Sequence, residues 1–268
     1  RYEYEEQLHA MSYARGEEAL ALRNVEQWRP GKFAFRNGRL TNSRDRNELA
    51  VGSRLITRLV ANEYQRLLPL HCTGRLLDLG CGKAPLYEVY ADLATDIVCA
   101  DWDHKGDGAC HLDLKCDLSQ PLPFEDNSFN TVLLSDVLEH IPDPHLLWQE
   151  LARIIAPGGK LILNTPFMYR IHEKPHDYFR YTEFALARFA NGVGMNILDL
   201  KAYGGALEVI VAILSRYLAA IPVIGALVSS ATQSIALWLV TTRHGRNFSV
   251  RSAGQFPLGY FVVAQNPG

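Results

Sequence analysis

The chain lacks the sequence marks of a secreted, a fibrous or a nucleic-acid-binding protein. Its five cysteines are an odd number, and none of them forms the C-x-x-C pair of common metal and redox motifs. Its first residues hold no apolar segment like the centre of a signal peptide. A formal net charge of −2 over 268 residues leaves no overall basic field for a nucleic acid. These absences predict a cytoplasmic protein with reduced thiols and no nucleic-acid partner.

What the chain does hold is the composition of a folded protein. Its 48% hydrophobic and 21% charged content is ordinary, and its length suits one or two domains. The charges are unevenly spread, however. Residues 36–58 hold six arginines against Asp45 and Glu48, whereas residues 88–143 hold thirteen acids against two lysines. A local basic segment is therefore available for an anionic partner.

From residue 75 onward, short apolar runs alternate with helical patterns. Glycine or acidic turns bound the runs, and helix-length segments separate them. This alternation predicts an α/β fold with a mostly parallel, doubly wound sheet covered by helices on both faces. A helix is expected through Leu146 to Ile155, ending at Pro157-Gly158-Gly159. The expected strands cover residues 75–79, 96–100, 131–135, 160–164, 196–201 and 259–264.

The first seventy residues differ from this pattern. Val51, Leu55 and Leu59 recur at helical spacing, and the arginines lie off that face. Between Arg29 and Asn47 the chain is rich in glycine, asparagine and arginine, which predicts a loop. Residues 1–70 are therefore expected to form a helical extension, ahead of a core that covers residues 71–201.

The most informative stretch is the glycine turn after the first expected strand, in residues 76–85. Gly80 and Gly82 would let a ligand approach the backbone where a Cβ would block it. A dinucleotide fingerprint needs a third glycine, whose place Pro85 takes here. Asp78 would repel a pyrophosphate, but it suits a ligand that carries an ammonium or sulfonium group. The alternative is a glycine turn that binds nothing.

Two further acids stand where such a ligand would need them. Asp101 ends the second expected strand, about twenty residues beyond the glycines, where a carboxylate can accept both ribose hydroxyls. Asp117, followed by Leu118, could accept a hydrogen bond from an adenine amino group. Either acid alone would more often be a solvated residue at a strand end, so the inference depends on their combination.

These motifs resemble the class I S-adenosylmethionine-dependent methyltransferases, close to the branch that includes the ubiquinone and menaquinone biosynthesis methyltransferases. Their order and spacing agree over roughly residues 70–200. Ala84 departs from the pattern, because many relatives have a further glycine there. The matching segments are residues 77–82, 101, 117, 122–129, 138–144 and 156–163.

The resemblance implies a Rossmann-like sheet of seven strands, completed by a reversed last strand within residues 258–268. It also implies S-adenosyl-L-methionine as the cofactor, with Trp102 and Leu118 beside the adenine and Ser135 near the methionine part. The implied cofactor contacts are Asp78, Gly80, Gly82, Asp101, Trp102, Asp117, Leu118 and Ser135.

The loop of residues 166–182 follows the expected strand of residues 160–164 and should cover the pocket, because ligands bind at the carboxyl ends of such strands. Its H-x-x-P-x-D-x-x-R-x-T run is similar to one in a subgroup of these methyltransferases. We interpret His172 as the catalytic base, with Asp177 orienting it or acting itself, and Arg180 as binding an anionic group of the acceptor. The alternative is a structural Asp177–Arg180 ion pair, with Thr182 capping the next helix.

Other histidines and cysteines are weaker candidates. His140 is a second possible base, although its Glu-His-Ile setting favours a place in the pocket floor. A zinc site is not expected, so we predict no metal. The residues that fit no usual zinc spacing are His104, Cys110, His111 and Cys116.

We therefore predict a methyltransferase that acts on a small-molecule, lipid-linked or sugar-linked acceptor. The methylated atom is expected to be oxygen rather than nitrogen or carbon. A sulfonium methyl is already activated, so the protein mainly aligns the displacement and excludes water. The alternative is a catalytically silent S-adenosylmethionine-binding module that serves in protein interactions. An NAD-dependent reductase is disfavoured by Asp78 and Pro85.

Residues 202–257 form an apolar insert before the last strand, with hydrophobic residues at helical spacing. No charged residue occurs from Tyr217 to Thr242, a span nominally long enough to cross a bilayer. Pro222, Gly225 and several polar residues interrupt it, so a spanning helix is not expected. One alternative is a helical hairpin packed on its own domain or on a second subunit through residues 202–242. The other is a peripheral contact with the inner face of a membrane, where residues 36–58 meet anionic headgroups.

Overall fold

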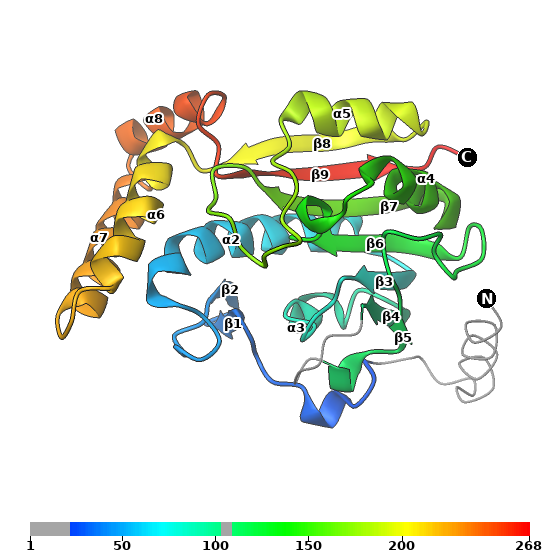
Figure 1. Cartoon of the computed structure of the whole chain (residues 1–268), viewed down its shortest axis with the longest axis horizontal. Helices are drawn as coiled ribbons and strands as arrows, with labels where there is room; N and C mark the ends of the chain where they lie inside the picture. The colour runs from blue at the N-terminus through cyan, green and yellow to red at the C-terminus, as the bar shows by residue number, and fades with distance from the viewer. Residues whose placement is uncertain (1–21, 103–108) are drawn as a thin grey trace.

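The computed structural model describes residues 22–102 and 109–268, and its centre is a seven-stranded sheet (Figure 1). The strands are β3 (Arg75–Leu79), β4 (Asp96–Asp101), β5 (Leu114–Lys115), β6 (Phe129–Ser135), β7 (Ile155–Pro166), β8 (Asn196–Tyr203) and β9 (Gly259–Gln265). They lie in the order β5-β4-β3-β6-β7-β9-β8. β9 runs antiparallel to β7 and β8, and the other pairs are parallel. The predicted Rossmann-like sheet with a reversed last strand is confirmed.

Alternating side chains divide the core between the two faces of this sheet. Leu76 belongs to the cluster on the face covered by α2 (Arg54–His71) and α3 (Tyr87–Tyr90). Its neighbour Leu77 belongs to the opposite cluster, covered by α4 (Pro144–Ile154) and α5 (Glu183–Gly192). Both faces are buried, which explains why the strands read as nearly continuous apolar runs.

The N-terminal segment is not purely helical, which corrects one prediction. Two strands, β1 (Phe33–Arg36) and β2 (Arg39–Asn42), form an antiparallel hairpin where a loop was expected. Asn37 and Gly38 join them with φ values of 52° and 69°, the conformation of a two-residue hairpin turn. The Asn-Gly pair was the available signal. Because β1 and β2 are short, the alternation of their apolar residues was too brief to reveal them.

The helix predicted through Leu146 to Ile155 is α4, but it ends at Ile154. Ile155 already pairs with Phe129 of β6, and Pro157 lies inside β7. The prediction that Pro157-Gly158-Gly159 ends the helix is therefore wrong. The chain leaves the helix earlier because its apolar residues join the sheet.

The insert consists of α6 (Ala206–Ala219), α7 (Gly225–Leu239) and α8 (Arg243–Ala253). The α6–α7 hairpin lies beyond the carboxyl ends of the parallel strands, beside the start of α2 (Figure 1). Gln233 holds it there: its Oε1 accepts the N–H of Leu55 at 2.7 Å, and its Nε2 donates to the carbonyl of Val51 at 2.9 Å. Among the described residues, no helix has both the length and the apolar character to cross a membrane.

Candidate active site

A cavity of about 990 Å³ lies at the carboxyl ends of the central strands, where the strand order reverses between β3 and β6. Its volume is at the upper end of the roughly 300–1,000 Å³ that is typical of ligand pockets. The N-terminal segment, α2 and the loop after β7 complete its walls. The structure brings together in its lining all eight residues predicted to contact the cofactor: Asp78, Gly80, Gly82, Asp101, Trp102, Asp117, Leu118 and Ser135.

The glycine turn after β3 has a backbone that explains its sequence. Gly80 has a φ of 76°, and a Cβ there would lie 2.4 Å from Cγ2 of Val137. Gly82 has a φ of 51°, and a Cβ there would meet nothing within 4 Å, so the space beside it is open to a ligand. Ala84 also has a positive φ, of 47°, which accounts for the glycine expected at that position. The turn therefore forms a cradle beside the cavity.

Acids at the ends of β4 and β5 flank this cradle. Asp101 accepts the N–H of Gly82 at 2.8 Å and that of Trp102 at 2.7 Å. Asp117 accepts both the backbone N–H and the hydroxyl of Ser119, at 2.9 and 2.7 Å. These bonds orient the two carboxylates at the cavity wall.

Asp78 lies below the glycine turn and is almost fully buried. The hydroxyl of Tyr90 donates a hydrogen bond to its Oδ2 at 2.8 Å. Burial raises the pKa of Asp78 to about 7, because a charged carboxylate is poorly solvated there. A cationic ligand in the cavity would reverse this effect by favouring the ionised form.

His172 lies on the cavity wall, whereas Asp177 and Arg180 lie behind it. Nδ1 of His172 is 3.2 Å from Oδ2 of Asp177, which also accepts the backbone N–H of His172 at 2.8 Å. Arg180 holds the pKa of Asp177 well below its usual value, so this carboxylate is ionised. An ionised carboxylate only accepts hydrogen bonds, which assigns the proton to Nδ1 and leaves Nε2 as an acceptor.

Arg180 is committed to this loop. Its Nη1 and Nη2 donate to the two carboxylate oxygens of Asp177 at 2.6 and 2.8 Å. The same atoms donate to the carbonyls of Phe179 and Arg170. The structure therefore contains the Asp177–Arg180 ion pair that was the alternative, and Arg180 is not part of the cavity lining, whereas its contact with an acceptor stays a prediction. Thr182 caps α5 by accepting the N–H of Ala185 at 3.2 Å.

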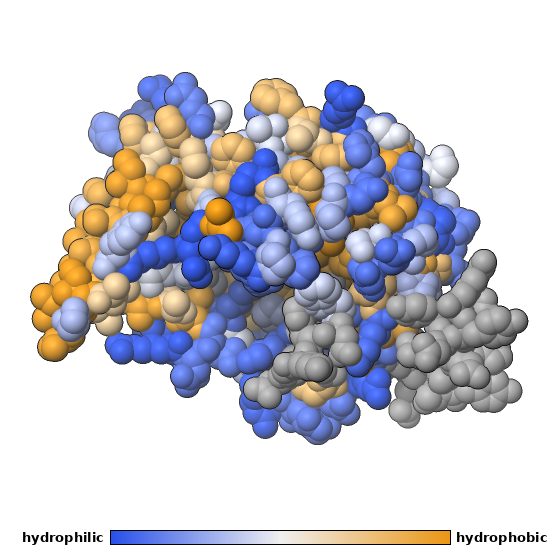
Figure 2. Space-filling model, in the orientation of Figure 1, coloured by the Kyte–Doolittle hydropathy of each residue, from blue (hydrophilic) through white to orange (hydrophobic). Residues whose placement is uncertain are grey.

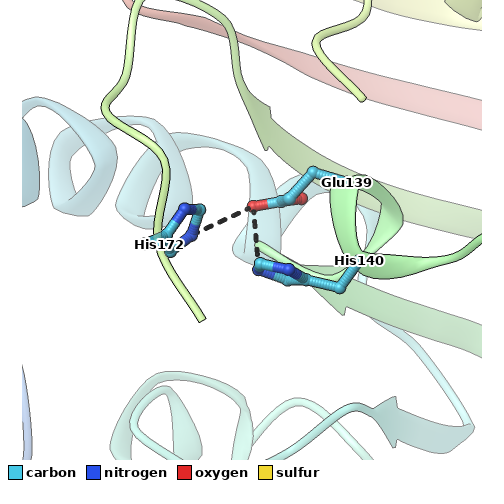
Figure 3. A group of neighbouring side chains, drawn as sticks. All are labelled: Glu139, His140 and His172. Atoms are coloured by element: carbon cyan, nitrogen blue, oxygen red, sulfur yellow. Dashed lines mark ion pairs between the residues drawn. The ribbon is translucent and has the colours of Figure 1, made fainter. Parts of the chain in front are cut away.

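Glu139 is the main residue of the site that the sequence reasoning missed. Its side chain is fully buried, and its Oε1 lies 3.7 Å from Nε2 of His140 and 3.9 Å from Nε2 of His172 (Figure 3). Burial, reinforced by Asp136, raises its pKa well above the usual value. Burial and the neighbouring His140 lower the pKa of His172. Both shifts favour the uncharged forms, which are the neutral carboxyl group of Glu139 and the neutral imidazole of His172.

One atom from each of these three residues lies within 4.8 Å of the others, so the cluster could also hold a cation. The absence of a metal remains a prediction. Nδ1 of His111 contacts the carbonyl of Arg23 at 2.9 Å. His104 lies outside the described residues.

Lys32 is a second residue that the sequence did not reveal. It reaches the cavity from the segment before β1, and its Nζ lies 2.9 Å from Oδ2 of Asp136. Asp136 also accepts a hydrogen bond from Nδ2 of Asn164 at 2.5 Å. The N-terminal segment thus supplies a cation to the cavity lining. Only the tertiary fold brings Lys32 there, because it precedes Asp136 by more than one hundred residues.

Comparisons with known proteins agree with this geometry. Residues 77–163 match the family described as "Methyltransferase domain". A ubiquinone biosynthesis O-methyltransferase of Xanthomonas oryzae pv. oryzae is 35% identical over 101 residues, which cover 34% of this chain and 42% of that protein. The protein of the same name from Coxiella burnetii is 24% identical over 151 residues, covering 47% of this chain and 64% of that protein. The aligned regions therefore span less than two thirds of these relatives.

The fold has a counterpart among solved structures. A SAM-dependent methyltransferase from Archaeoglobus fulgidus superposes with a TM-score of 0.51 and 13% identity, covering 77% of this chain and 93% of that one. Together with the sheet order and the glycine cradle, these findings define the class. The chain carries a class I S-adenosylmethionine-dependent methyltransferase domain.

Proposed function

We propose that the chain transfers a methyl group from S-adenosylmethionine to an oxygen atom of a small-molecule acceptor. The observation that carries the proposal is that His172, with an unprotonated Nε2, lines the same cavity as the cofactor residues. The names of the O-methyltransferase relatives support an oxygen acceptor. A cytoplasmic setting is part of the proposal and is supported by five free cysteines.

The cavity fits this cofactor in the character of its lining. Open space adjoins Gly82, and carboxylates at the ends of β4 and β5 can accept hydrogen bonds from a ribose and an adenine. Asp101 would hold the ribose hydroxyls and Asp117 the adenine amino group. When bound, S-adenosylmethionine supplies an activated methyl group on a positively charged sulfur.

The rest of the cavity would hold the acceptor. Phe33, Ile56 and Val60 supply apolar surface, and Lys32 and Tyr203 supply polar groups at its edge. This mixture suits an aromatic, lipid-linked or sugar-linked molecule with one hydroxyl to methylate. His172 would take the hydroxyl proton at Nε2 while Asp177 holds the ring through Nδ1, which is the arrangement of a general base and its orienting carboxylate.

A methyl-transfer assay tests the proposal against a binding module without catalysis. The purified chain is incubated with methyl-labelled S-adenosylmethionine and a lipid extract of cells. A second reaction contains the same labelled cofactor and a polar extract. We expect label to appear in an acceptor of one extract as a methyl ether or ester. If S-adenosylhomocysteine binds tightly but no label moves in any extract, the chain is the silent module.

The raised pKa of Asp78 makes a further prediction about the cofactor. S-adenosylmethionine brings a sulfonium and an ammonium, which favour ionised Asp78, so binding should release a proton. Since the pKa of free Asp78 is raised to about 7, affinity should increase as the pH rises through that value. We expect a gain of about ten-fold between about pH 6 and about pH 8.

Titration calorimetry in buffers of different ionisation enthalpy measures the released proton directly. The variant Asp78→Asn should lose the proton release and the pH dependence, while Asp92→Asn, at an exposed position, should keep both. If wild type and Asp78→Asn released the proton equally on cofactor binding, the proton would come from another group.

A further inference from the structure

The insert carries an exposed apolar surface that the proposed methyl transfer does not use. One stripe on α6 repeats at helical spacing, and a second on α7 continues it beyond the hairpin tip. Figure 2 shows apolar side chains gathered over the α6–α7 hairpin. Val223 at the tip is fully exposed and has a φ of 65°, which is rare for a β-branched residue. The exposed members are Ile210, Ile213, Leu214, Tyr217, Ile221, Val223, Ile224, Leu227, Ile235 and Trp238.

A cluster of arginines lies beside this apolar surface. Four of them line a cavity of about 360 Å³ together with Asn37 and Thr41. None of the six arginines in residues 36–58 forms an ion pair with a carboxylate of the described parts of the chain, which are residues 22–102 and 109–268. Desolvation lowers the pKa of Arg54, and the charges of Arg46, Arg44 and Arg36 add to the shift. We call Arg36, Arg39, Arg44, Arg46, Arg54 and Arg58 the arginine cluster.

The two surfaces are physically joined. Nη1 of Arg54 donates to the hydroxyl of Ser230 on α7 at 3.4 Å, and its Nη2 donates to the carbonyl of Arg44 at 2.9 Å. Figure 2 shows hydrophilic surface directly below the apolar hairpin. The hairpin also contacts the active site, because the guanidinium of Arg216 on α6 lies 4.3 Å from the ring centroid of Tyr169, which lines the catalytic cavity.

We propose that the α6–α7 hairpin and the arginine cluster together dock the protein on an anionic lipid bilayer. The hairpin would enter the interface between headgroups and acyl chains, and the arginines would bind lipid phosphates. The proposal does not depend on methyl transfer. If both hold, the catalytic cavity lies beside the membrane, where an apolar acceptor is concentrated.

Charge favours a bilayer over a second copy of the chain. No aspartate or glutamate occurs in residues 209–268, whereas this segment contains Arg216, Arg243, Arg246 and Arg251. A two-fold dimer through the hairpin would place the same surface of each copy against the other, and so bring two sets of unpaired arginines together. An anionic membrane instead supplies opposite charge along the whole surface. Because neither α6 nor α7 can cross a bilayer, the contact would be interfacial.

Vesicle flotation of the full chain tests the docking. We expect it to float with phosphatidylcholine vesicles that contain phosphatidylglycerol, and to stay at the bottom with phosphatidylcholine alone or in high salt. The double variant Arg39→Glu, Arg44→Glu should weaken binding by about five-fold or more for each arginine. Val223→Glu should also abolish flotation, because it places a carboxylate at the tip.

Matched controls separate docking from general effects of charge or folding. Phe184→Glu alters an exposed aromatic residue on α5, and Arg188→Glu reverses an exposed arginine on the same helix, so both should float like wild type. Every variant should bind S-adenosylhomocysteine normally, which shows an intact fold independently of any acceptor. The proposal is overturned if wild type stays at the bottom with anionic vesicles, or if the controls lose flotation equally. If the wild type were a dimer in solution and Val223→Glu were a monomer, the hairpin would be the contact surface for a second copy of the chain.

Discussion

Replacing His172 by alanine should lower turnover by about 10²–10⁴-fold, the usual contribution of a general base. Its Nε2 is the unprotonated ring atom on the cavity wall, and Asp177 fixes the ring through Nδ1. Cofactor affinity should change little, because His172 lies on the loop after β7 rather than at the glycine turn. Turnover of an identified acceptor and titration with S-adenosylhomocysteine measure the two effects separately. His145→Ala, at an exposed histidine on α4, is the matched control.

The pH dependence of the same reaction identifies the base. Burial and the neighbouring His140 lower the pKa of His172, so its active, neutral form persists to a more acidic pH than that of a free histidine. Activity should therefore fall only as the pH drops below the usual histidine range, and this acidic limb should disappear in His172→Ala. The charge of Asp177 raises the pKa of His172 and so opposes this lowering. Asp177→Asn should therefore move the acidic limb of the activity profile to still lower pH. Full activity of His172→Ala would show that alignment alone drives the transfer.

The half of the site that we propose to hold the cofactor was predictable because each of its parts is a local motif. Asp78 lies one residue before the end of β3, Asp101 ends β4, and Asp117 follows β5. Parallel strands bring their carboxyl ends to the same side of a sheet. Spacing along the chain was therefore enough to place these residues together. The reversed last strand followed from the family resemblance, since nothing in the residues of β9 themselves sets its direction.

The half that we propose to hold the acceptor could not be predicted in the same way. Lys32 reaches the cavity only because the β1–β2 hairpin packs against α2, and this contact leaves no local pattern. Glu139 stood inside a recognised segment, but a glutamate side chain is rarely fully buried, so the residue type did not predict its place in the core. Its complete burial depends on β7 and on the loop that carries His172. For Arg180 the sequence left open both a contact with the acceptor and an ion pair with Asp177, and the ion pair could be recognised only from the three-dimensional contact.

The charges of the site can be understood together. Lys32 neutralises Asp136, Arg180 neutralises Asp177, and Asp78 and Glu139 have raised pKa values because burial disfavours their charged forms. These ion pairs and pKa shifts reduce the net negative charge near the floor of the cavity. Binding a sulfonium would then draw out the proton of Asp78, which couples the charge of the cofactor to the ionisation of the wall.

Replacing Asp101 by alanine should weaken the binding of S-adenosylhomocysteine by at least about ten-fold, because hydrogen bonds to a charged group contribute about 1.5–3 kcal/mol. Two losses combine. The ribose would lose its carboxylate partner, and the N–H of Gly82 would lose the acceptor that now lies 2.8 Å away. Asp101→Asn should be intermediate, since its amide oxygen can still accept one of these bonds.

Calorimetric titration gives the affinities, and thermal unfolding without ligand shows whether the fold survives. Asp101 is at the end of β4 rather than in the core of the sheet, so the unfolding temperature of Asp101→Ala should stay close to that of wild type. Asp92→Ala, which removes an exposed carboxylate of similar charge, controls for the field of the acidic segment. Unchanged affinity in Asp101→Ala would remove Asp101 from the ribose site. If Asp92→Ala lost as much affinity as Asp101→Ala, the effect would come from overall charge. Of these two aspartates, only Asp101 lines the cavity and bonds to the glycine turn.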